Sequence, residues 1–305
     1  MPLDAGVKAL LDSLAAAKQP PLDKLTPQAA RALYRRQIEA AAGKTIEVGK
    51  VEDLKIPGPG GEISVRVYTP AADAKGCLLW FHGGGFVIGD LSTHDDLCRR
   101  FCTNDLLVIA VDYRLAPEHR YPAQVDDALA ALEWTVTKYR GLKLAVGGDS
   151  AGGALAAILA QREGAKDDPR IAYQILFCPW LDLFANTASG SRNAFGTDHL
   201  LELSSLDWSR RHYLGNFADP QDVSISPLKT RSLDDLPPAY ILTAECDPLR
   251  DDGKTYAHRL TAAGVSVTYC EAPGMIHNFF CMAEAIPAGG PAIEEAAAAY
   301  LEAVK

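Results

Sequence analysis

The amino-acid sequence predicts an α/β fold, with a mostly parallel central sheet and helices on both of its faces. Two observations predict this fold: short, nearly continuous apolar runs recur along the chain, and helix-length segments separate them. Strands that are covered on both faces consist of such apolar runs, and alternation of strand and helix is typical of parallel sheets. With 305 residues, of which 48% are hydrophobic and 23% charged, the chain has the composition of a globular protein. We expect residues 1–305 to form a single domain.

The N-terminal part of the chain predicts helices. Its opening segment is amphipathic and is interrupted by acidic residues, so it does not resemble a signal peptide. We expect this first helix to be ended by Pro20 and Pro21. In a second segment, Thr26 is the expected N-cap, Pro27 takes the first helical position and Gly43 is the expected end.

The strands come next and alternate with helices. The first strand alternates apolar and polar residues, as a half-buried strand does, and the following strands are continuously apolar. The expected strands are 63–70, 76–84, 106–114, 142–148, 173–179, 239–245 and 265–272. The expected helices between them are 93–104, 123–139, 150–164 and 254–264. The last strand, VSVTYCEA, is a candidate sheet edge that could pair with a second copy of the chain.

One stretch interrupts this rhythm. Residues 185–235 have no clear strand pattern, contain scattered aromatic residues and prolines, and include a helical candidate at 204–215. Because the stretch lies between two sheet strands, we interpret it as an insertion into the α/β core.

Net charge and hydropathy exclude two classes of partner. The chain has 30 Lys and Arg residues against 39 Asp and Glu residues, a net charge of −9. Such a surface repels nucleic acid and anionic lipid. No stretch approaches the roughly 18 uninterrupted apolar residues that a transmembrane helix needs. We expect no nucleic-acid partner and no membrane span.

The seven cysteines predict reduced, structural thiols. Several lie inside apolar strand-like runs, where Cys acts as a small hydrophobic residue. No nearby His or Cys pair completes a zinc-binding set. This pattern predicts a cytoplasmic protein with no structural metal.

The sequence GDSAG is the first chemical signal. Gly148, Ser150 and Gly152 match the pattern G-x-S-x-G, placed directly between an expected strand and an expected helix. A nucleophilic serine on a sharp strand-to-helix turn requires this context, because the glycines let neighbouring backbone approach closely. The alternative is a glycine-rich turn with a capping serine. The flanking strand and helix favour Ser150 as a nucleophile.

The second signal is the run HGGG after a buried strand. Three consecutive glycines permit a tight turn with exposed N–H groups, as in the oxyanion hole of esterases and lipases. The amides of Gly84 and Gly85 would join that of Ala151 in this role, and His82 is expected to brace the loop. A plain turn or a phosphate loop is the alternative. Neither GK[ST] nor G-x-G-x-x-G is present, which disfavours the phosphate loop.

Two late strand ends supply an acid and a base. Asp247 follows the expected strand 239–245, and His277 lies in a loop beyond the last strand. The order Ser150, Asp247, His277 is that of an α/β-hydrolase triad. Asp251 and Asp252 are competing acids, but they fall at or inside the next helix and are worse placed.

These blocks together resemble the hormone-sensitive-lipase family of α/β-hydrolases, in its GDSAG branch. The similar segments are 81–101, 111–128, 147–156, 247–253 and 274–280, in the family's order. The resemblance implies an α/β-hydrolase fold with a helical cap built from about residues 1–45 and 185–235. It places the triad on Ser150, Asp247 and His277, with oxyanion donors at Gly84, Gly85 and Ala151. It also assigns Glu118 and His119 to a scaffolding block.

The resemblance implies a carboxylesterase for small-molecule esters with short to medium acyl chains. The expected mechanism is two-step acyl transfer, which needs no metal or organic cofactor. The alternatives are an amidase or N-acyl hydrolase with the same triad, and a non-catalytic ligand receptor on the same fold. A homodimer is a further expectation. Candidate pocket residues, each equally compatible with a core role, are Phe86, Phe184, Phe195, Trp208, Tyr213 and Phe217.

Overall fold

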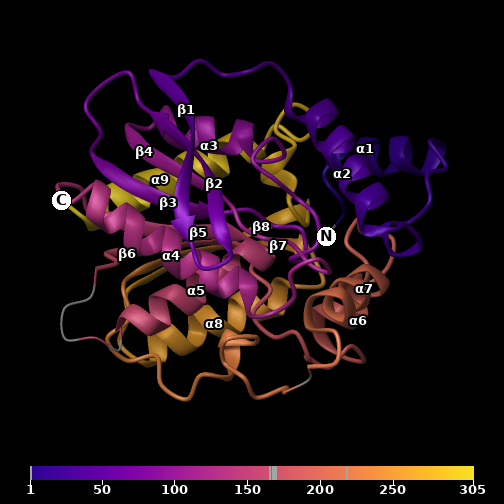
Figure 1. Cartoon of the computed structure of the whole chain (residues 1–305). Helices are drawn as coiled ribbons and strands as arrows, with labels where there is room; N and C mark the ends of the chain where they lie inside the picture. Colours follow the sequence, from indigo (N-terminus) through magenta and orange to yellow (C-terminus); the bar gives the residue numbers. More distant parts are fainter. Residues whose placement is uncertain (1, 165, 167–169, 218) are drawn as a thin grey trace.

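A twisted central sheet organises the structure (Figure 1), a computed structural model that describes residues 2–164, 166, 170–217 and 219–305. The described residues form eight strands in the order β1-β2-β4-β3-β5-β6-β7-β8. The strands are β1 (Lys50–Gly58), β2 (Gly61–Thr69), β3 (Gly76–Phe81), β4 (Leu106–Asp112), β5 (Leu144–Asp149), β6 (Tyr173–Phe177), β7 (Ala239–Cys246) and β8 (Val267–Ile276). β1 and β2 are antiparallel to their neighbours, and all pairs from β4 to β8 are parallel. The predicted mostly parallel α/β fold is confirmed.

One strand, β1, was not predicted from the sequence. Its sequence, KVEDLKIPG, lies at the edge of the sheet and is largely exposed or half-buried. An edge strand needs no continuous apolar run, so the segment has no strong strand signal. β8 forms the opposite edge of the sheet, as predicted.

Helices cover both faces of the sheet. The α-helices are α1 (Ala5–Ala16), α2 (Pro27–Ala42), α3 (Asp95–Cys102), α4 (Ala123–Lys138), α5 (Ala151–Gly164), α6 (Gly190–Phe195), α7 (Leu203–Leu214), α8 (Arg250–Ala262) and α9 (Gly289–Ala303). Short 3₁₀ helices lie at Leu22–Lys24, Pro227–Lys229 and Phe279–Cys281. α3 and α9 pack on one face, and α4, α5 and α8 on the other. Among the helices described, none is both long and apolar enough to cross a membrane.

The core is divided between the two faces of the sheet. Along β3, Leu79 and Phe81 point into the core shared with α4, α5 and α8, while Leu78 and Trp80 point into the core shared with α3 and α9. This alternation follows from the two-residue period of a strand. It explains why the central strands are apolar at every position: both of their faces are buried.

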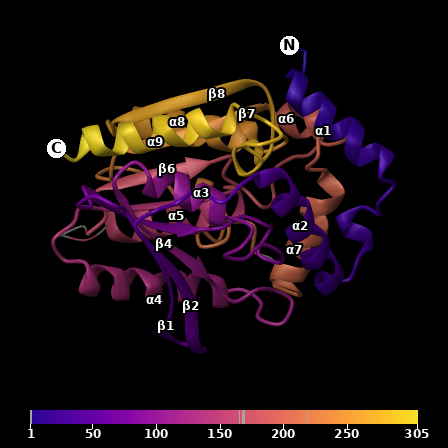
Figure 2. The same ribbon diagram turned by 90° about the horizontal axis from the view of Figure 1, so that it is seen from above.

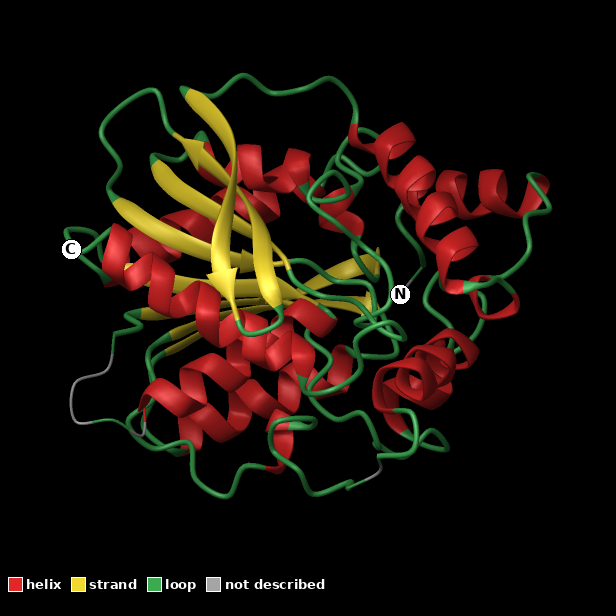
Figure 3. Ribbon diagram, viewed as in Figure 1, coloured by secondary structure: helices red, strands yellow, loops and turns green. Residues whose placement is uncertain are grey.

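The remaining α-helices, α1, α2, α6 and α7, lie together on the side of the molecule opposite the C-terminus (Figures 1 and 2). Figure 3 shows them as a purely helical region beside the sheet. α2 begins and ends as predicted: Thr26 Oγ1 accepts a hydrogen bond from the Ala29 amide at 3.3 Å, and Gly43 ends the helix with a φ of +85°. α1 ends at Ala16, shortly before the predicted stop at Pro20. Within the described part of residues 185–235 there is no strand, as expected.

Candidate active site

Ser150 occupies a strained turn between β5 and α5. Its φ is +53°, a conformation that costs a non-glycine residue about 1–3 kcal/mol. Backbone hydrogen bonds on both sides hold it there: the Ser150 amide donates to the Phe177 carbonyl at 3.0 Å, and the Trp180 amide donates to the Ser150 carbonyl at 2.9 Å. The side chain is only 4% exposed and lines a cavity. The predicted strand–turn–helix context of Ser150 is present.

The glycines beside Ser150 allow strand and helix to approach closely. A Cβ added at Gly152 would lie 1.9 Å from the Phe81 carbonyl oxygen, and one at Gly148 would lie 2.4 Å from the carbonyl group of Gly152. Both distances are far below van der Waals contact, and the obstructing atoms are backbone. Glycine is therefore required at both positions by packing.

The HGGG loop forms a second tight turn beside Ser150. Gly84 has a φ of +116° and Gly85 a φ of +61°, both in the region that favours glycine. The Gly84 carbonyl accepts hydrogen bonds from the amides of Val87 at 3.0 Å and Ile88 at 2.9 Å, which closes the turn. Among the described residues, none accepts a hydrogen bond from the amides of Gly84, Gly85 or Ala151. These three donors are left for a ligand.

Asp247 and His277 form a buried hydrogen-bonded pair. Asp247 follows β7 and is fully buried, and His277 follows β8 and is 5% exposed. His277 Nδ1 lies 2.8 Å from Asp247 Oδ2, while the Leu249 amide donates to Asp247 Oδ1 at 2.8 Å. Because Nδ1 is bound to the carboxylate, Nε2 is the ring nitrogen that remains for a hydroxyl group. His277 lines the same cavity as Ser150.

The two competing carboxylates take part in other contacts. Asp251 accepts a hydrogen bond from the Ser191 amide at 2.8 Å. Asp252 is buried and pairs with Arg192 at 2.9 Å. Both residues therefore connect α8 to the segment around α6, away from His277.

Two residues beside the Asp247–His277 pair were not foreseen. The Cys178 thiol lies close to Asp247, and burial together with that carboxylate raises the pKa of the thiol well above its usual range, so it stays protonated. Asn278, with a φ of +59°, directly follows His277, and its Nδ2 donates to the Tyr34 hydroxyl of α2 at 3.4 Å. Burial raises the pKa of Tyr34 well above its ordinary value, which keeps this phenol neutral. The contact between Tyr34 and Asn278 joins segments at opposite ends of the chain, so no local pattern could have revealed it.

A buried polar cluster lies beneath the HGGG loop. The Gly83 amide donates to Asp149 Oδ1 at 3.0 Å, and His94 Nε2 lies 3.0 Å from the same oxygen. His82, expected to brace the loop, places Nδ1 2.8 Å from the Gly83 carbonyl and stacks on Tyr113. Burial, with a contribution from His94, lowers the pKa of His82 to about 4, so its ring is neutral. His94 lies within segment 81–101, one of the segments that resemble the family, but no sequence pattern assigned it a role.

Ion pairs tie α2 to loops of the sheet. Arg31 binds Glu118 and also donates to the Val87 carbonyl at 2.8 Å, next to the HGGG loop. Hydrogen bonds from the Arg31 guanidinium lower the pKa of Glu118 to about 2. Arg35 binds Asp90 in the same way. The scaffolding role expected for Glu118 is thus a contact between the loop after β4 and α2.

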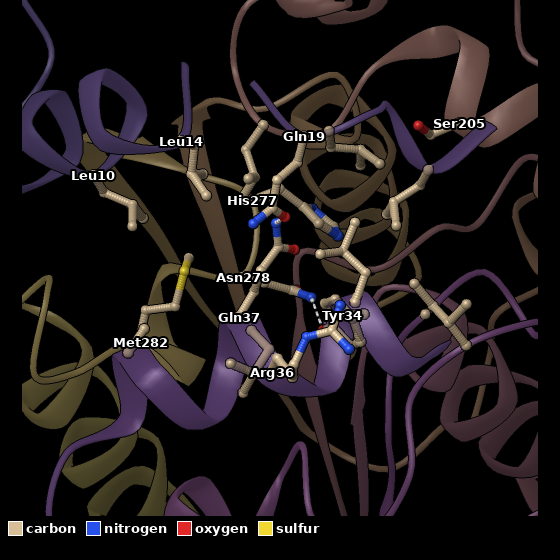
Figure 4. Close-up of a pocket in the computed structure, with 18 of the residues that line it drawn as sticks. Leu10, Leu14, Gln19, Tyr34, Arg36, Gln37, Ser205, His277, Asn278 and Met282 are labelled. Atoms are coloured by element: carbon tan, nitrogen blue, oxygen red, sulfur yellow. Dashed lines mark hydrogen bonds between the residues drawn. The ribbon is translucent and has the colours of Figure 1, made fainter. Parts of the chain in front are cut away.

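The cavity that Ser150 and His277 share has a volume of about 460 Å³. Its walls come from α1, α2 and α7 together with the HGGG loop and the segment after β8 (Figure 4). Most of the lining is apolar, as with Leu14 of α1 and Met282. Of the six aromatic residues considered in the sequence, Trp208 lines this cavity. Phe86 and Tyr213 instead stack on each other in the core, with ring centroids 4.0 Å apart.

Two clusters of described residues have atoms of the kind that bind metals. They are His94, Asp149 and Cys281, and Cys178, Asp247 and His277; in each the candidate ligand atoms lie within 4.8 Å of one another. All six side chains are buried. In the second cluster, Asp247 and His277 already bind each other, so an ion would have to displace that hydrogen bond.

Fold and site together define an α/β hydrolase: a serine on a sharp turn after a central strand, with an acid–histidine pair at two later strand ends. Comparison with known proteins agrees. A family model described as alpha/beta hydrolase fold matches residues 78–281. The chain belongs to this family, and the similarity to hormone-sensitive-lipase-type hydrolases noted in the sequence is confirmed.

Named relatives and solved structures cover most of the chain. The carboxylic ester hydrolase LipN of Mycobacterium tuberculosis is 44% identical over 264 residues, which are 82% of this chain and 69% of LipN. Ethyl acetate hydrolase of Pseudomonas putida is 38% identical over 92% of this chain and 89% of its own. Among solved structures, an ester hydrolase from the metagenome of Lake Arreo, in complex with a bipyridine phosphonate derivative, superposes with a TM-score of 0.93 at 39% identity over 98% of each chain. A hyperthermophilic esterase of Pyrobaculum calidifontis superposes with a TM-score of 0.91 at 35% identity, over 100% of this chain and 99% of its own.

Proposed function

We propose that Ser150, Asp247 and His277 are the catalytic triad of a serine carboxylesterase. The chain is a carboxylic-ester hydrolase, as its family and its named relatives indicate. The observation that carries the triad is the meeting of three features at one cavity: Ser150 on its strained turn, His277 bound to Asp247, and three amides without an acceptor among the described residues.

Hydrolysis proceeds in two acyl-transfer steps. Ser150 Oγ attacks the ester carbonyl carbon while His277 Nε2 accepts its proton, and Asp247 stabilises the charged imidazole through Nδ1. The oxyanion accepts hydrogen bonds from the amides of Gly84, Gly85 and Ala151. Removing one such donor typically costs about 3–4 kcal/mol of transition-state stabilisation. The alcohol leaves with the proton from Nε2, and water then releases the acid by the same route.

The substrates are small esters with short to medium acyl chains. A cavity of about 460 Å³ with a largely apolar lining suits such molecules. Within a single domain of residues 1–305, about residues 1–45 and 185–235 act as the cap, since α1, α2 and α7 supply much of the cavity wall.

Turnover of para-nitrophenyl esters from acetate to palmitate, with Ser150→Ala beside the wild type, tests this proposal. We expect turnover that peaks at short or medium chains and is abolished in Ser150→Ala, with an unchanged thermal midpoint. Rates on para-nitroanilides with the same acyl groups separate an esterase from an amidase. An amidase must protonate the poorer, amine leaving group, and an esterase should hydrolyse the anilides far more slowly than the esters. A folded wild-type protein that hydrolyses no ester would overturn the assignment.

Two further properties belong to this proposal. We propose a homodimer formed through β8, which is an edge strand of the sheet with alternating exposure, and light scattering at several concentrations tests it. We propose a cytoplasmic location because all seven cysteines are free thiols, six of them buried. Fractionation of cells that express the protein tests the location.

A further inference from the structure

The active-site cavity contains one arginine. Among the described residues that line it, Arg36 of α2 is the only one with a permanent charge, and no carboxylate shares the lining. The chain as a whole carries a net charge of −9, so a cation at this place contrasts with the general surface. Figure 4 shows Arg36 extending from α2 among the side chains around the cavity, together with Tyr34 and Asn278.

Arg36 differs from the other two arginines of its helix. Arg31 binds Glu118 and Arg35 binds Asp90, so both have a carboxylate partner outside the cavity. Within the described part of the chain, Arg36 has no carboxylate at ion-pair distance. An arginine that served only to attach α2 to the loops would have such a partner. The exposed guanidinium of Arg36 is solvated, and its position in the cavity lining leaves it free to bind a ligand group.

The chemistry of the guanidinium defines that group. Its planar fork matches a carboxylate through two parallel hydrogen bonds. Tyr34 adds a donor in the same cavity: its oxygen accepts from Asn278, which leaves its own proton available. Gln37 and Gln19, by contrast, bind each other at 3.2 Å.

We propose that the preferred substrates are esters that carry a free carboxylate, such as monoesters of dicarboxylic acids, and that Arg36 binds this carboxylate. The inference rests on the proposed esterase function and specifies its substrate class. Arg36 is an exposed residue, so its replacement removes the charge without disturbing the core.

Two pairs of substrates test the proposal and locate the carboxylate. For the acyl side, kcat/KM is compared between the para-nitrophenyl monoester of succinate and para-nitrophenyl butanoate. For the alcohol side, para-acetoxybenzoate is compared with para-tolyl acetate. The variants are Arg36→Gln, Arg36→Lys and the control Arg140→Gln, which removes the same charge from an exposed turn after α4.

In at least one pair, we expect Arg36→Gln to lower the preference for the anionic ester by about fivefold to tenfold, with the neutral ester unchanged. Arg36→Lys should retain part of the preference, Arg140→Gln all of it, and added salt should weaken it in the wild type. An anionic-to-neutral ratio that is the same in wild type and Arg36→Gln for both pairs would overturn the proposal. The esterase function is tested separately: it would still be supported if the wild type hydrolyses para-nitrophenyl butanoate and Ser150→Ala does not.

Discussion

The loops at the ends of the strands and the helices that lie over them are held in different ways. Around Ser150 and the HGGG loop, backbone packs against backbone, and Gly152 leaves no room for a single methyl group. α2, by contrast, is attached by partly exposed ion pairs such as Arg35–Asp90, which contribute little each. The difference teaches that packing fixes the proposed reacting groups, whereas the helices proposed to form the cap are attached by contacts that should tolerate substitution.

The largest effect should come from the acid of the buried pair. In Asp247→Asn, an amide replaces the carboxylate that holds His277 Nδ1, so the ring loses its orientation and its stabilised charge. We expect kcat to fall by about 10³- to 10⁴-fold with little change in KM, measured by steady-state kinetics on para-nitrophenyl butanoate. Asp251→Asn is the control and should retain nearly full activity. A loss of less than tenfold in Asp247→Asn would place the acid elsewhere.

A methyl group at Gly152 tests the backbone packing directly. In Gly152→Ala the new Cβ meets the Phe81 carbonyl oxygen at 1.9 Å, so β3 and α5 must separate. We expect the free energy of unfolding in urea to fall by about 4 kcal/mol. Gly141→Ala is the matched control, because its Cβ meets no atom within 4 Å, and should change stability by about 1 kcal/mol or less. Equal losses of unfolding free energy in Gly152→Ala and Gly141→Ala would show that close backbone packing at Gly152 does not contribute specially to stability.

The pH dependence of stability tests the polar groups beneath the HGGG loop. Burial lowers the pKa of His82 from 6.5 to about 4, so between these values the unfolded chain binds a proton that the folded chain does not. The free energy of unfolding should therefore fall as the pH is lowered from 6.5 to 4, by about 3 kcal/mol from this residue, with no contribution above that range. His82→Gln should lack this part of the slope in urea titrations at several pH values. A slope identical to that of the wild type would show that the His82 ring takes up a proton in the folded protein.

The smallest effect should come from the helical side. Leu14 of α1 lines the cavity and is half-buried, so Leu14→Trp fills part of the cavity from its helical side. We expect kcat/KM for the octanoate ester to fall about fivefold, while that for acetate stays within about twofold of the wild type. Equal losses on both esters would mean that the helices position the reacting groups as well as the substrate.

Local turns are easier to predict from the sequence than edge strands or contacts between distant segments, for a physical reason. Ser150 and Gly152 follow from a local pattern, since a tight turn imposes its residue types on neighbours in the chain. β1 was missed because an edge strand can be polar, and α9 was not predicted although it is largely helix-forming in composition. The contact between Asn278 and Tyr34, and the unpaired state of Arg36, depend on residues far apart in sequence and could be found only in the folded chain.

The attachment of the N-terminal helices also affects how the protein is made. The Asp4 amide donates to the Gly274 carbonyl, and the Glu284 amide donates to the Ala41 carbonyl, so α1 and the end of α2 dock on segments that are synthesised much later than the helices themselves. At about 5–20 residues per second, these two contacts form on the order of ten seconds or more after the helices are synthesised, later than the contacts of α2 with Asp90 and Glu118. During that interval the sides of α1 and α2 that contact these segments are uncovered. Ester hydrolysis by the proposed triad can begin only after His277 has been synthesised.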